Sequence, residues 1–182
     1  MKSFFRKVAF GIGPNEEVPS DPLSWALNQV SDVPKLSWTG RLNSEKELRL
    51  LYREWVYNDR KVIRKKYKDN KTLYKTHRDL LRHKTGQKFW ESLEITVRHN
   101  EAINSNNPVL AKLWMFWGNF FTISDKDFLA NYSTGPYQRE IIRPNLNQTF
   151  EKMVYDVTTS WAMIHHLDNS ESAGPKSVTA SQ

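Results

Sequence analysis

Two adjacent histidines and a nearby aspartate are the residues of this sequence that best match a metal site. His165 and His166 are followed by Asp168, and imidazole and carboxylate groups are common zinc ligands. Neighbouring helical residues point about 100° apart, whereas a zinc-binding pair on a helix occupies positions i and i+4. The two imidazoles would not share one ion easily, so we expect no metal and no cofactor. Instead, His165 and His166 are typical of the basic C-terminal end of an amphipathic helix.

A second set of residues could bind anions. The stretch DRKVIRKKYKDNKTLYKTHRDLLRHK interleaves basic side chains with Tyr67 and Tyr74, and nucleic-acid-binding proteins combine phosphate-neutralising cations with stacking rings. The candidate anion-binding face consists of Arg60, Arg64, Lys65, Lys68, Lys75, Arg78 and Arg82. Because acidic residues interrupt the stretch and no recognised motif is present, a solvated helical face is the simpler interpretation.

Two further patterns carry weaker chemical signals. The segment AFGIGP contains G-x-G but lacks the third glycine and the acidic residue of a dinucleotide site, so it predicts none. Glu140 and Arg143 stand at positions i and i+3 of one helical face, which predicts a structural ion pair. A functional polar cluster would require this pair to be buried with Tyr137 and fully hydrogen-bonded.

Composition sets the class of protein. The 182 residues favour one domain, with 38% hydrophobic and 13% aromatic residues available for a core. The absence of cysteine excludes disulfides, thiolate zinc sites and a cysteine nucleophile. The net charge of +7 is uneven, because residues 41–99 hold 17 Lys or Arg against 8 Asp or Glu. Such a local excess attracts phosphates or anionic surfaces.

The sequence predicts neither a signal peptide nor a membrane-spanning helix. The N-terminal apolar run breaks at Arg6–Lys7, so it does not match a signal peptide, and the chain as written is expected to be cytoplasmic. The run LWMFWGNFFT packs five large aromatic residues into ten positions. It is about half the ~20 residues that a spanning helix needs, and we interpret it as core.

Helices must position all of these residues. Apolar spacing predicts helices at 22–30, from Ser44 to about 70, at 72–105 with a break near Gly86, and at 108–121. Asp21 is the expected N-cap of the first, and Ser44 with Glu47 forms a capping box at the start of the second. Shorter helices are expected at 125–132 and 137–143, separated by a turn at Gly135–Pro136, and a long one begins at Pro144. The helix at 108–121 is apolar on all sides, which predicts a buried central helix.

We therefore expect an all-α fold, a single irregular bundle of about six to eight helices around this central aromatic-rich helix. Residues 1–168 should form the domain. Residues 169–182 are small and polar without periodicity, which predicts a disordered tail.

Three segments together resemble one bacterial family. RKVAFGIGP is similar to an R-x-x-F-G-x-x-P opening, and KLWMFWGNFFTIS to W-x-N-H-F-T-V-S. The third segment, YQREIIRP followed by a helix and AMIHHLDNSESAGP, resembles Y-x-R-E-x-I-R-P and A-M-L-x-Y-L-D-N-x-x-S-x-G-P. These patterns identify the chain as similar to domain of unknown function 1800. Phe120 stands where the family has histidine, which removes an ionisable group, and Trp161 stands where it has proline.

The resemblance implies a mainly helical protein, often exported or envelope-associated, with no established catalysis. Carried over residue by residue, it gives a candidate polar cluster of Asn119, Tyr137, Arg139, Glu140, Arg143, Asp168 and Asn169. Family members usually continue into a helix reading like N-E-N-x-A-R-E-L-L-E-L-H, so we expect this chain to be the N-terminal portion of a longer domain or a truncated relative.

Three functional hypotheses remain open. The first is a binding or scaffold role at the bacterial cell envelope, with an unknown protein partner. The second is the N-terminal part of an enzyme of unknown reaction and unknown catalytic residues. The third, ranked last, is a nucleic-acid-binding module that uses segment 60–88.

Overall fold

All regular secondary structure in the described part of the chain is helical. The computed structural model describes residues 2–13, 16–84, 86–124, 128–169 and 172, and these contain no strand. The predicted all-α class is thereby confirmed. The elements are α1 (Lys2–Val8), α2 (Pro22–Val30), α3 (Glu45–Glu54), the π-helical η1 (Trp55–Arg60), α4 (Lys61–Lys66), α5 (Lys71–Lys84), α6 (Gln87–Asn104), α7 (Pro108–Phe120), α8 (Phe128–Tyr137), the π-helical η2 (Gln138–Ile142), the 3-10 helix η3 (Arg143–Asn145), α9 (Phe150–Thr159) and α10 (Trp161–His166).

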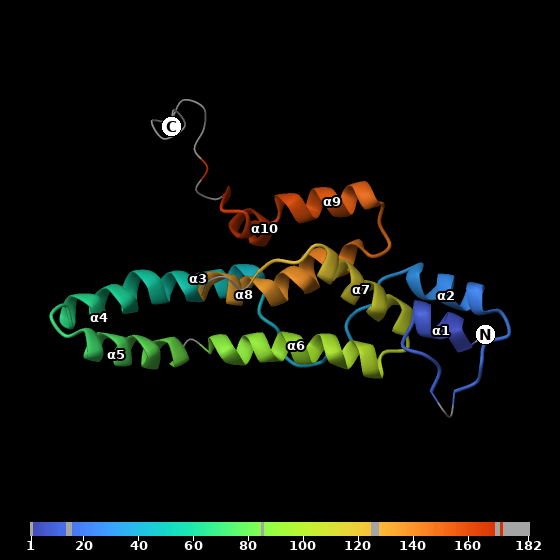
Figure 1. Ribbon diagram of the computed structural model, residues 1–182, viewed down its shortest axis with the longest axis horizontal. Helices are drawn as coiled ribbons and strands as arrows, with labels where there is room; N and C mark the ends of the chain where they lie inside the picture. Colours follow the sequence, from blue (N-terminus) through green and yellow to red (C-terminus); the bar gives the residue numbers. More distant parts are fainter. Residues whose placement is uncertain (1, 14–15, 85, 125–127, 170–171, 173–182) are drawn as a thin grey trace.

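A long antiparallel hairpin forms the body of the molecule. One arm runs through α3, η1 and α4, and the other through α5 and α6 (Figure 1). The predicted capping box starts the first arm, because Ser44 and Glu47 bond each other's backbone N–H groups. The predicted break at Gly86 separates α5 from α6, and its φ of 69° is a conformation that glycine adopts without strain.

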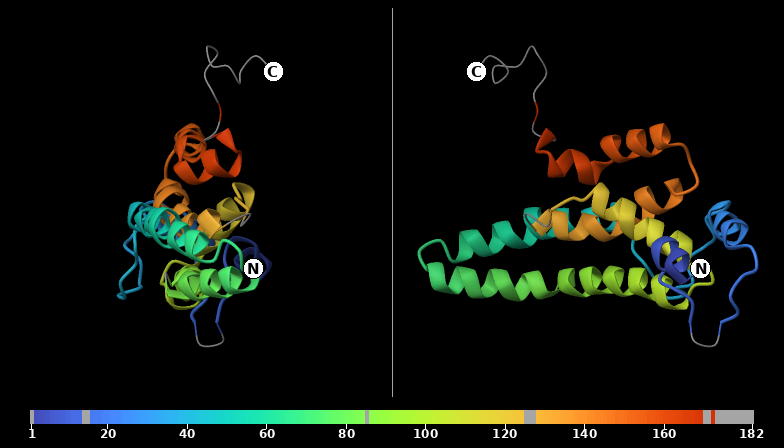
Figure 2. Two further views of the ribbon diagram at one scale, coloured as in Figure 1. Left: turned by 90° about the vertical axis from the view of Figure 1, so that its left-hand side faces the viewer. Right: turned by 45° about the vertical axis from the view of Figure 1, so that its right-hand side comes forward.

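Helix α8 lies beside the α3 arm of the hairpin, at a level above α5 and α6 (Figure 1). Helix α8 packs against both α3 and α6. Helices α9 and α10 form a further layer on the side of α8 away from α5 and α6 (Figure 2). The short helices α1 and α2 sit at the opposite end of the hairpin from its tip, next to α7.

The core lies where α7, α8, η2 and α9 meet. Trp114 of α7 is 3% exposed, and its indole N–H donates to the Gln138 carbonyl oxygen at 2.7 Å. The interpretation of α7 as buried on all sides is wrong, however, because Phe116 and Phe120 are 55% and 61% exposed. No described helix covers that face, although the apolar pattern is the same all round.

A short N-terminal helix was not expected from the sequence. Phe5 of α1 is 1% exposed and makes an edge-to-face contact with Trp25 of α2, with ring centroids 5.2 Å apart. Lys112 of α7 donates to the carbonyl oxygens of Arg6 and Ala9 at 2.5 and 2.6 Å. A cation on the last carbonyls stabilises a helix end, so α7 holds this helix in place.

Two predicted boundaries at prolines are wrong, and one predicted helix is divided in two. Helix α8 continues through Gly135–Pro136 into η2 instead of turning there, because packing between α3 and α6 overrides the local signal. Pro144 lies in η3, and the following helix begins at Phe150, capped by Thr149. Ser160 then ends α9 and caps α10, so the expected single helix is two.

Two of the sequence predictions concern the C-terminal tail and membrane-spanning helices. The predicted tail falls mainly on residues 170–171 and 173–182, which lie outside the described residues. Within the described ranges, no helix is both long and apolar enough to cross a bilayer.

Candidate functional site: polar clusters and an aromatic surface

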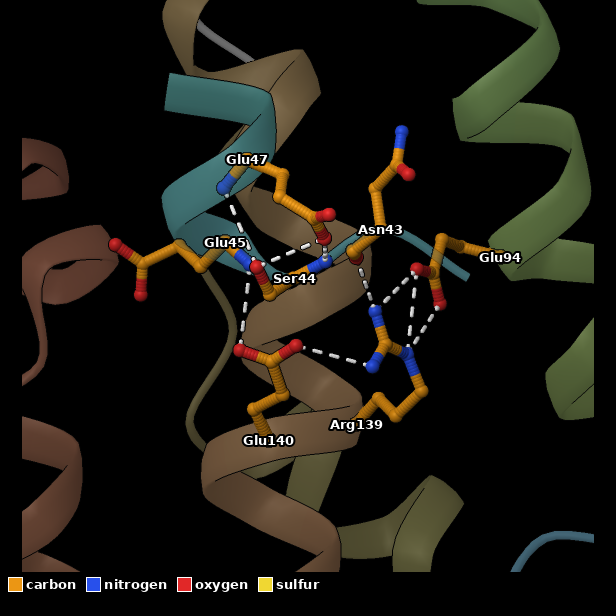
Figure 3. Close-up of polar contacts among 7 residues, drawn as sticks. All are labelled: Asn43, Ser44, Glu45, Glu47, Glu94, Arg139 and Glu140. Atoms are coloured by element: carbon orange, nitrogen blue, oxygen red, sulfur yellow. Dashed lines mark hydrogen bonds and ion pairs between the residues drawn. The ribbon is translucent and has the colours of Figure 1, made fainter. Parts of the chain in front are cut away.

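Arg139 lies at the centre of a polar cluster that joins three elements (Figure 3). Its Nη2 donates to Glu94 Oε1 of α6 at 2.9 Å and to the Asn43 carbonyl oxygen, just before α3, at 2.6 Å. Its Nη1 donates to Glu140 Oε1 at 3.0 Å. Burial alone would lower the pKa of Arg139, but the hydrogen bonds and charge of Glu94, with those of Glu140, raise it. The cluster therefore fixes η2 against α6 and α3.

Glu140 extends this cluster to the start of α3. Its Oε2 accepts a hydrogen bond from the Glu45 N–H at 3.3 Å, one of the backbone donors that a helix N-terminus leaves unpaired. The adjacent capping box holds the pKa of Glu47 below its usual range, through hydrogen bonds from Ser44. Figure 3 shows the carboxylates of Glu47 and Glu140 on either side of the start of α3.

The predicted ion pair between Glu140 and Arg143 is wrong. Glu140 pairs with Arg139 instead, while Arg143 pairs with Glu101 of α6, Nη2 to Oε2, at 3.6 Å. The reason is the π-helical winding of residues 138–142, whose wider turn takes positions i and i+3 off a common face. Sequence spacing could not reveal this winding.

Glu101 and Arg143 form a second buried cluster. Glu101 is 5% exposed, and its Oε1 accepts from both the N–H and the hydroxyl of Ser37 at 2.5 Å. The guanidinium of Arg143 lies over the Trp114 ring, 5.6 Å from its centroid. Burial lowers the pKa of Arg143, and Glu101 opposes that shift. The cluster therefore joins α6 and η3 to the segment before α3.

The remaining members of the expected polar cluster are not brought together. Tyr137 is fully buried, donates to the Phe121 carbonyl oxygen at 2.8 Å, and has its pKa raised by burial. Asn119, Asp168 and Asn169 are exposed. Asp168 has a φ of 57° just after α10 ends, a conformation that aspartate tolerates at such positions.

An aromatic surface, which the sequence analysis assigned to the core, lies on α7 and the start of α9. We define it as Phe116, Trp117, Phe120, Phe121 and Phe150. Trp117 is the central ring, with centroid distances of 5.0 Å to Phe116, 5.5 Å to Phe120 and 5.6 Å to Phe150. Phe150 is 57% exposed, like the two outward rings of α7. The i, i+4 spacing of Phe116 and Phe120 was the available sequence signal.

Comparison with known proteins identifies the family. The family model described as protein of unknown function (DUF1800) matches residues 4–177. The chain belongs to the DUF1800 family. No curated protein and no solved structure matches it.

His165 and His166 of this DUF1800 chain each contact another residue of the protein. The His165 ring stacks on Trp161, 5.2 Å between centroids and 4° from parallel. The Ser124 N–H donates to Nδ1 of His166 at 3.0 Å. Among the residues that the structure describes, no three His, Cys, Asp or Glu side chains gather to hold a metal ion.

The candidate anion-binding face of the DUF1800 chain divides into two parts. Arg64, Lys65 and Lys68 are exposed on α4 and the turn that follows it, and Lys75 is exposed on α5, so they share the projecting tip of the hairpin. Arg60 lies over the Trp55 ring at 5.6 Å, and Arg78 pairs with Asp79 at 2.7 Å. The side chain of Arg82 lies outside the described residues.

Proposed function

We propose that this chain is a protein-binding module whose interface is the aromatic surface. The observation that carries the proposal is the clustering of three half-exposed phenylalanines, 55–61% exposed, around one tryptophan. Contiguous exposed apolar patches mark interaction sites, and aromatic residues supply most of the binding energy in such sites. The partner would be a protein with an apolar surface of its own, as the binding or scaffold role at the cell envelope implies.

The lack of charged residues in the α7 part of the aromatic surface supports an apolar partner. Between Leu113 and Ser124 the chain has no charged residue, and the cores of protein interfaces are likewise depleted of charge. The buried polar clusters support the proposal indirectly. Because Glu94 and Glu101 are held by arginines and N–H or O–H donors, they fit a structural role better than acid–base catalysis.

A photo-crosslinking experiment in the native cell tests this proposal. A photoreactive phenylalanine at position 120 should give one discrete adduct, which disappears when Phe116 and Phe150 become serine. The matched control is Phe89 of α6, which is also 61% exposed but lies outside the aromatic surface. Equal adducts from positions 89 and 120, or none from position 120, would contradict the proposal.

A second candidate function, binding of polyanions, rests on the hairpin tip. Residues 60–75 contain eight Lys or Arg and a single Asp, on a tip that projects from the body (Figure 1). Affinity for duplex DNA that falls about tenfold or more between roughly 50 and 200 mM salt, and that Lys65→Gln with Lys68→Gln weakens, would support it. Equal binding by the variant would contradict it.

A further inference from the structure

A cavity of about 130 Å³ opens between α6, α8 and α3, away from the aromatic surface. One face of α6 forms much of its wall, through Glu91, Glu94, Ile95 and Arg98, which recur at helical spacing. Ile95 is 42% exposed, so this wall reaches the molecular surface. A small molecule could therefore enter without unfolding the hairpin.

Most of the remaining wall is apolar. Leu48, Trp114 and Tyr132 are 1%, 3% and 1% exposed, and Trp90 and Pro136 line the same space. An engineered apolar cavity of about 150 Å³ binds benzene. This cavity has a similar size, so it fits a single six-membered ring or an aliphatic group of that volume.

Arg98 brings an unpaired positive charge to this apolar space. Arg98 is partly buried, and no hydrogen bond and no ion pair within 4.0 Å joins its side chain to any described residue. Glu94, at the i−4 position where an ion pair is expected, is held by Arg139 instead. Burial lowers the pKa of Arg98 and the charge of Glu94 opposes the shift, but an arginine remains protonated in proteins. A desolvated cation without a partner favours an anionic ligand.

Gln138 also lines this cavity, but its side-chain amide faces α7. It is 6% exposed, and its Nε2 donates to the Gly118 carbonyl oxygen at 3.1 Å. Its Oε1 is buried and has no donor in the part of the chain that the structure describes. This amide packs against the backbone of Gly118 in α7, so the ligand need not supply a donor to it.

We propose that this cavity binds a small monocarboxylate with a ring-sized apolar body, the carboxylate contacting Arg98 and the body lying against Trp90, Trp114 and Tyr132. Glu91 lies seven residues before Arg98, which is about 10 Å along the helix axis. Because Glu91 also lines the cavity, its negative charge disfavours a second negative charge on the ligand.

A charge series on one ring tests the proposal with the full chain. Benzoate, benzamide and benzylamine share the ring and differ in charge, and their binding can be followed by saturation-transfer NMR and calorimetry. Benzoate should bind in the millimolar range or tighter, with benzamide weaker by about tenfold and benzylamine weaker still. No benzoate binding, or stronger binding of benzylamine, would overturn the proposal.

Variants of Arg98 separate binding from folding. Arg98→Met keeps an unbranched side chain but removes the positive charge, and it should weaken benzoate binding by about tenfold or more. The Tm of this variant should stay equal or rise, because an unpaired charge is removed. Arg64→Gln on α4 is the control for the change in net charge and should leave benzoate binding unchanged. Unchanged benzoate affinity in Arg98→Met would overturn the proposal. If that variant fails to fold, the charge series on the natural chain still decides.

Discussion

Glu94 and Arg98 occupy positions i and i+4 of α6 but do not pair, because Arg139 of η2 holds the Glu94 carboxylate at 2.9 Å. Glutamate four residues before a cation is the favourable order for a helical ion pair. The tertiary contact therefore replaces the local one. It fixes η2 on α6 and leaves a cation on the cavity wall.

Removing Arg139 should destabilise the fold. Its side chain and that of Glu94 are 13% and 10% exposed, and breaking a buried pair costs about 3–5 kcal/mol. We expect about 3 kcal/mol for Arg139→Gln in urea unfolding, because the released Glu94 can then turn to Arg98. Lys152→Gln is the control, since its pair with Asp156 is solvent-exposed at the lysine, 54%, and should contribute less than about 1 kcal/mol. Equal losses in the two variants would contradict this view of the cluster.

The same variant should also weaken benzoate binding. Once Glu94 is free to pair with Arg98, the cation on the cavity wall is neutralised, and affinity should fall by about tenfold. Calorimetry at a temperature where Arg139→Gln remains folded measures this. Stronger or equal binding would show that Glu94 does not compete for Arg98.

Tyr137 predicts a loss of stability at alkaline pH. Its folded-state pKa is raised by burial, so the unfolded chain gives up this proton first. The contribution of Tyr137 to the free energy of unfolding is fully present below the unfolded-state pKa of about 10 and is lost as the pH rises beyond it. Tyr137→Phe should remove this part of the pH dependence and cost about 1–3 kcal/mol at neutral pH, since the Phe121 carbonyl loses its donor. Tyr155→Phe, at a 67% exposed position, should change neither quantity.

Gly118 is predicted to be intolerant of any side chain. A Cβ there would collide with the amide of Gln138, which is itself buried and bonded to the Gly118 carbonyl. Gly118→Ala should cost about 1–3 kcal/mol by overpacking. The cost should be smaller in a Gln138→Ala background, which a double-mutant cycle measures. Additive losses would mean that the collision is relieved elsewhere.

Local chemistry predicted much of the fold. The Asp21 cap of α2, the Ser44–Glu47 capping box and the break at Gly86 depend on residues close in sequence, and the structure has all three. The family resemblance singled out Tyr137, Arg139 and Arg143 without assigning them a physical role. Their buried contacts now give each one a structural role.

The errors came from tertiary structure that leaves no local signal. The π-helical winding of η2 sends Arg143 to Glu101, 42 residues earlier in the chain. Packing between α3 and α6 carries α8 through Pro136. The all-round apolar pattern of α7 predicts burial, but periodicity cannot say which neighbour, if any, covers Phe116 and Phe120.

The affinity for the partner captured at position 120 tests the central claim most directly. Phe116→Ser with Phe120→Ser should raise the Kd by about tenfold or more and change the unfolding free energy by less than about 0.5 kcal/mol, because both rings are exposed. Phe89→Ser should leave the Kd within about twofold. A double variant that binds as well as the natural chain, or that loses affinity only as far as it unfolds, would contradict the assignment of the aromatic surface as a binding site.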